Sequence, residues 1–130
     1  MTLSEPSKEL AIRLLGDVSF EERLRAANLT PMRGSLEHSI YGFRQAVNFL
    51  RIDEFEDLVA AGPRASVAYI HPDALRKWVA EVLGDTELAD AIGEAIAEGA
   101  NYVEIMRPVK ELMEHRLSQC DSVLASKSTN

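Results

Sequence analysis

The sequence lacks the features of a secreted, membrane-spanning or cysteine-rich protein. Cys120 is the only cysteine among 130 residues, which excludes an internal disulfide bond and any metal site built from several cysteines. No run of ~18 apolar residues is present, so no stretch of the sequence predicts a membrane-spanning helix. The N-terminus also lacks the basic start and the apolar centre of a secretory signal. We therefore expect a cytoplasmic protein without a membrane partner.

Positive charge is also scarce. The chain has 14 Lys and Arg residues against 21 Asp and Glu residues, so its formal net charge is -7. Binding to duplex nucleic acid needs a basic surface that displaces counterions, so this charge argues against a nucleic-acid partner. A nucleic-acid-binding regulator stays open as a third hypothesis, because five arginines in the first half could form a local patch: Arg23, Arg25, Arg33, Arg44 and Arg51.

Sequence motifs for catalysis or cofactor binding are missing. The seven glycines are scattered and form no phosphate-binding loop. The three histidines, His38, His71 and His115, fit neither a His-Glu-x-x-His motif nor a Glu-x-x-His repeat. His115 and Cys120 are five residues apart on one predicted helix and so face different directions. The sequence therefore predicts no catalytic residue and no cofactor.

What the sequence does contain is a succession of helical patterns. Apolar residues recur at spacings of three and four, which predicts amphipathic helices over most of the chain. Ser19 to Glu22 matches a capping box at the start of one of them. The stretch Val67–Ile70 is open between a short strand and an extended lead-in. The predicted helices span residues 5–15, 19–29, 35–50, 53–61, 72–83, 85–98 and 101–124.

These patterns predict a single all-α domain over residues 1–130, with a polar and frayed tail at 125–130. Six or seven helices would form a helical bundle around one core. Two of them, 35–50 and 53–61, could be one bent rod. Trp78 lies at the centre of an i, i+3, i+4, i+7 pattern, so we expect its side chain to be largely buried.

The last predicted helix is unusually long. Its apolar stripe continues to Leu124 beside the polar tail, and Pro108 inside it predicts a kink or a break. Large apolar patches left in water usually mark contact sites. We therefore expect part of this stripe to form a homo-oligomer interface, although the whole stripe could instead pack within one subunit. The interface candidates are Met106, Val109, Leu112, Met113, Leu117, Cys120 and Leu124.

Acidic residues gather in the second half of the chain. No Lys or Arg occurs between Lys77 and Arg107. A strip of four acids, Glu87, Asp90, Glu94 and Glu98, falls on one face of the predicted helix 85–98. Like charges at i, i+4 destabilise a helix by a few tenths of a kcal/mol per pair. The strip is a solvated helix face, a site for a hard metal ion, or a docking face for a basic partner.

Two pairs of carboxylates have i, i+3 spacing, namely Glu54 with Asp57 and Glu87 with Asp90. Such pairs on two helices could hold Mg²⁺ or Mn²⁺ against a phosphate. This makes a metal-dependent hydrolase of a nucleotide or phosphate ester the second hypothesis. Acids near a helix start are also favoured by the helix dipole alone. The first hypothesis is a non-catalytic regulatory or accessory protein that acts through protein–protein contacts, either with a partner protein or as a homo-oligomer.

Overall fold

The computed structural model describes residues 3–30, 34–52, 59–62 and 67–128, and it shows a mixed α/β fold. Five α-helices and one 3₁₀ helix in these residues accompany a three-stranded antiparallel sheet with strand order β2-β1-β3. The all-α prediction and the helical-bundle description are therefore wrong. The elements are α1 (Lys8–Leu15), η1 (Phe20–Glu22), β1 (Leu24–Thr30), β2 (Gly34–Ile40), α2 (Phe43–Phe49), β3 (Val67–Tyr69), α4 (Pro72–Glu81), α5 (Thr86–Glu98) and α6 (Tyr102–Ser128).

The sheet occupies two stretches that were predicted to be helical. Strand β1 pairs with β2 in register from Leu24 opposite Ile40 to Thr30 opposite Gly34. Side chains alternate between the two faces of a strand. Leu24 and Ala26 are accordingly buried on the inner face, whereas Arg25 between them is exposed. Burial of one face against the helices explains why this segment is a strand.

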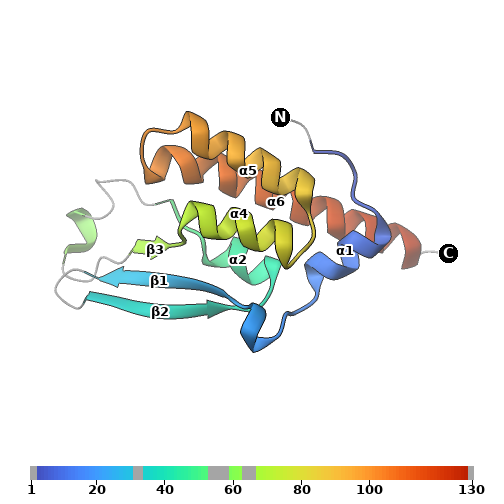
Figure 1. The fold of residues 1–130 in the computed structure, drawn as a ribbon, viewed down its shortest axis with the longest axis horizontal. Coiled ribbons are helices and arrows are strands. Elements are labelled where there is room, and N and C mark those ends of the chain that lie inside the picture. The colour runs from blue at the N-terminus through green and yellow to red at the C-terminus, as the bar shows by residue number, and fades with distance from the viewer. Residues whose placement is uncertain (1–2, 31–33, 53–58, 63–66, 129–130) are drawn as a thin grey trace.

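The helices lie on one side of the sheet (Figure 1). Helices α4 and α2 contact strands β1 and β2, and α5 and α6 lie beyond them. On the opposite, solvent-facing side of the sheet, Arg25 pairs with Glu37.

The short strand β3 confirms the strand alternative for Val67–Ile70. The predicted helix at 53–61 falls mostly outside the described residues.

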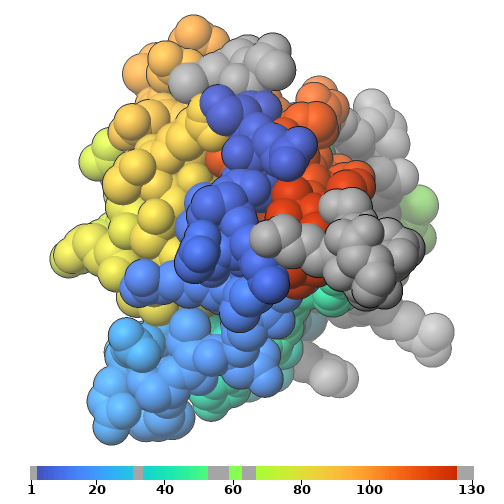
Figure 2. Space-filling model, turned by 90° about the vertical axis from the view of Figure 1, so that its right-hand side faces the viewer, coloured from blue at the N-terminus to red at the C-terminus, as the bar shows by residue number. Residues whose placement is uncertain are grey.

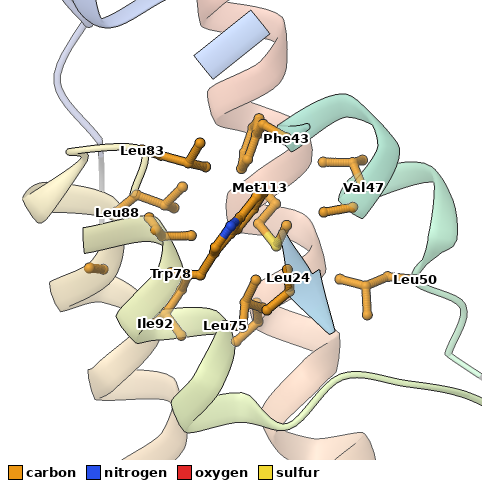
Figure 3. Close-up of a cluster of buried hydrophobic side chains, with 14 of the residues drawn as sticks. Leu24, Phe43, Val47, Leu50, Leu75, Trp78, Leu83, Leu88, Ile92 and Met113 are labelled. Carbon is orange, nitrogen blue, oxygen red and sulfur yellow. The ribbon is translucent and has the colours of Figure 1, made fainter. Parts of the chain in front are cut away.

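Trp78 is at the centre of the core, as expected from its spacing (Figure 3). Its side chain is 5% exposed and lies among Leu75, Leu83, Ile92 and Met113. The indole Nε1–H donates a hydrogen bond of 2.7 Å to the backbone carbonyl of Glu22. This bond satisfies the only polar atom of the side chain, so the burial leaves no donor unpaired.

The second half of the chain follows the predicted helices closely. Asp85 caps α5 by accepting from the Leu88 N–H, and Asn101 caps α6 by accepting from the Glu104 N–H. Helix α6 has 27 residues and continues through Pro108, so it is not broken there. It also extends to Ser128, into the stretch expected to be frayed. Within the described residues, no helix is both long and apolar enough to cross a membrane.

Candidate binding site

A groove of about 670 Å³ runs between α5 and α6. The two helices form an antiparallel hairpin, because only residues 99–101 connect them. Gly99 makes this tight connection possible: a Cβ atom there would lie 2.5 Å from the Ile105 side chain and 2.9 Å from the Ile105 backbone nitrogen. The volume falls within the range of ligand-binding clefts in proteins.

The groove has an apolar floor and a charged rim. Ala91 and Ala95 of α5 are 2% and 8% exposed, and Pro108 and Leu112 of α6 are half-buried. The exposed lining residues carry charge or a titratable ring: Glu94, Glu98, Glu104, Arg107, Glu111 and His115. Four carboxylates and one guanidinium give the lining a formal charge of −3 with His115 neutral. This surface is suited to a ligand that is both cationic and partly apolar.

Three of these carboxylates are unpaired. Glu94, Glu98 and Glu111 form neither a hydrogen bond nor an ion pair with another described residue. Glu104 differs, because its carboxylate accepts from the Ala100 N–H and from the Asn101 amide at the start of α6. The negative charge of Glu94, Glu98 and Glu111 is thus available to an external cation.

Pro108 leaves one backbone carbonyl of α6 without its helical donor. Proline has no backbone N–H, so the carbonyl of Glu104, four residues earlier, loses that hydrogen bond. Glu104 and Pro108 both belong to the groove lining.

Several arginines of the chain pair with carboxylates outside the groove. Arg23 and Arg25 pair with Glu37 across the hairpin, and Arg44 pairs with Asp121 at 2.6 Å. Arg51 also has an interaction partner, and Arg33 lies outside the described residues. At least three of the five arginines considered for nucleic-acid binding are therefore paired with carboxylates of the same protein, and two of these three share Glu37.

Glu87 belongs to a different cluster, which we call the latch. It consists of Ser4, Glu87 and Arg116 and holds the N-terminal segment in place. Its carboxylate accepts from the Ser4 N–H at 3.0 Å, from the Ser4 hydroxyl at 2.8 Å and from Arg116 at 2.7 Å. The Ser4 hydroxyl and then the Arg116 guanidinium hold the pKa of Glu87 below its usual range. Figure 2 shows the N-terminal residues lying between α5 and α6.

Arg116 is the centre of this latch and is fully buried. Its Nη1 donates a hydrogen bond of 2.6 Å to the Ser4 carbonyl. Its Nε lies 2.9 Å from Oδ2 of the buried Asp85, so the two side chains form an ion pair, although these two atoms do not have hydrogen-bond geometry. Gln119 donates to the Leu3 carbonyl one turn further along α6. The sequence pattern did not indicate these contacts, because the partners are more than eighty residues apart or on different helices.

Only one of the two carboxylate pairs proposed for a metal, Glu87 with Asp90, lies in the described part of the chain. Glu87 is bound to Ser4 and Arg116, Asp90 is exposed, and Glu54 and Asp57 lie outside the described residues. No group of three or more His, Cys, Asp or Glu side chains among the described residues is placed to hold a metal ion. The predicted acidic strip is likewise divided, since Glu94 and Glu98 line the groove while Glu87 serves the latch.

The interface candidates on α6 also fall into two groups. Met106, Val109, Met113 and Cys120 are fully buried within one subunit, whereas Leu112, Leu117 and Leu124 are half-buried. Burial raises the pKa of the Cys120 thiol to about 11, so this group stays protonated at neutral pH and is a core residue. Only the three leucines are accessible to a partner in this conformation.

Sequence reasoning missed Glu104 and Glu111 as part of the site. They are seven residues apart, which is two helical turns and places them on one face. That signal is present in the sequence, but their position opposite Glu94 and Glu98 depends on the hairpin.

A scan against protein-family models and searches of the curated proteins and of the solved structures find no match to this chain.

Proposed function

We propose that this protein is a non-catalytic, cytoplasmic binding module whose α5–α6 groove receives a cationic segment of a partner protein. The observation that carries the proposal is a set of three carboxylates around an apolar floor, Glu94, Glu98 and Glu111, that pair with no other residue in the described part of the chain. Such a surface favours Lys or Arg side chains over neutral or acidic ones. The pairing of Arg23, Arg25 and Arg44 with carboxylates outside the groove supports an external source for these cations.

The groove can be tested by charge reversal. We expect Glu94→Lys/Glu98→Lys to weaken binding of a lysine-rich, fluorescein-labelled peptide by at least about tenfold, because two attractive contacts become repulsive. Fluorescence anisotropy at low and at physiological salt measures the affinity, and salt should weaken the wild-type complex.

The matched control is Glu9→Lys/Glu81→Lys. Both residues are exposed and neither lines the groove, so the net charge of the protein changes equally. We expect less than about a twofold effect on affinity in this control. Equal weakening in both double variants would show that the peptide responds to overall charge, and it would contradict a role for the groove.

Self-association is a second candidate, favoured by one observation. Leu117 and Leu124 are half-buried and seven residues apart on the last turns of α6, so they share a face that the parent core does not fully cover. If this face joins two copies, Leu117→Lys/Leu124→Lys converts a dimer into a folded monomer. Light scattering after size exclusion measures the mass. A wild-type protein that is already monomeric at high micromolar concentration would exclude this interface.

A further inference from the structure

We infer that the segment received by the groove is an amphipathic helix of the partner protein, with Lys or Arg along both of its edges. The inference rests on the proposed function and adds the conformation and charge pattern of the ligand. It follows from three properties of the groove: its shape, the internal pairing of most backbone groups in its two helices, and the position of charge on each rim.

The shape suits a third helix. Helix α5 has 13 residues, so its length is about 20 Å at 1.5 Å per residue. The floor residues Ala91 and Ala95 are one turn apart and small, which leaves a shallow channel between the two helix axes. A third helix of similar length can lie in such a channel and pack its side-chain ridges against those of α5 and α6.

The chemistry of the floor disfavours an extended peptide. An extended chain must pair its backbone N–H and C=O groups with a strand edge or with water, and burying them unpaired is costly. The groove is bounded by two helices whose backbone groups are mostly paired internally, and the edges of the sheet, β2 and β3, are elsewhere. A helix pairs its own backbone groups and needs from the groove only apolar contact and charge.

The rims specify the charge pattern. Glu94 and Glu98 lie one turn apart on the α5 side, and Glu111 lies on the α6 side. A helix between them meets carboxylates along both edges, so cations are required on both flanks of its apolar face.

The test compares two labelled peptides of about fourteen residues, the length that spans α5. The first contains Lys, Leu and Ala in an amphipathic helical pattern, and the second has two interior alanines replaced by proline, which prevents the helix and keeps the charge. We expect the helical peptide to bind at least about tenfold more tightly and to gain helical circular dichroism on binding. Glu94→Lys/Glu98→Lys should abolish the preference, and a peptide with Glu in place of Lys should then bind this variant.

The outcomes separate the two proposals. Equal affinity of both peptides, with binding still dependent on Glu94 and Glu98, would overturn the helix and retain the cationic groove. Affinity that does not depend on Glu94 and Glu98 for either peptide would overturn the groove itself. Spermidine serves as a third probe: if it competes with the helical peptide at concentrations near that peptide's own Kd, the site is for a small polyamine and the helix is excluded.

Discussion

Replacing Arg116 with alanine is expected to lower the free energy of unfolding by about 3–5 kcal/mol. Arg116 is fully buried, and its guanidinium pairs with Asp85, which is 1% exposed. Removing the cation leaves a buried carboxylate without its counter-charge and also frees the Ser4 carbonyl from its donor. Chemical denaturation followed by circular dichroism measures the loss.

The matched control is Arg44→Ala, which removes an ion pair of similar length that is exposed to solvent. The side chains of Arg44 and Asp121 are 52% and 49% exposed, so we expect a loss of at most about 1 kcal/mol. The double variant Arg116→Met/Asp85→Asn keeps a cap for α5 and removes both charges. It should be more stable than Arg116→Ala alone. A loss for Arg116→Ala no greater than that for Arg44→Ala would show that the latch is not a stabilising ion pair.

The second large effect is expected at Trp78. Alanine there should cost about 3–5 kcal/mol, because the side chain is 5% exposed and its removal leaves a cavity among the core residues of α4, α5 and α6. Denaturant unfolding of the variant, followed by circular dichroism, gives the value. The wild-type tryptophan emission should be blue-shifted, and it should move towards the emission of an exposed indole on unfolding.

Trp78→Phe separates packing from hydrogen bonding. Phenylalanine retains much of the apolar volume and loses the 2.7 Å bond from the indole N–H to the Glu22 carbonyl. We expect a smaller loss, of roughly 1–2 kcal/mol. A native emission spectrum typical of indole in water, or a negligible cost for Trp78→Ala, would contradict the position of this residue at the centre of the core.

The helical half of the fold was predictable because its signals are local. Each helix start depends on residues within one turn: Pro72 begins α4, Asp85 caps α5 and Asn101 caps α6.

The apolar stripe from Leu36 to Leu50 was misleading. Leu36 and Ile40 are four apart, and a spacing of four places residues on one face of a helix and also on one face of a strand. The structure divides this stripe between β2 and α2.

The capping box at Ser19 was misleading for a related reason. The Ser19 hydroxyl does meet the Glu22 carboxylate at 3.1 Å, but only the short helix η1 follows. Leu24 and Ala26 then alternate with exposed Arg25, a strand pattern that is too short to outweigh the helical spacing around it.

The groove was only partly predictable from the sequence. Its α5 rim is the acidic strip, and its α6 rim is brought opposite by the hairpin.

The latch between Ser4 and Arg116 joins positions that are 112 residues apart in the sequence. Contacts of such separation slow folding, because a long loop must close before the contact contributes. Helix α6 follows every other described element in the chain, and it supplies the buried Met106, Val109 and Met113. The N-terminal segment and much of the core therefore lack part of their native contacts until α6 has been synthesised and has packed. We expect the segment around Ser4 and helix α6 to become ordered together, late in folding.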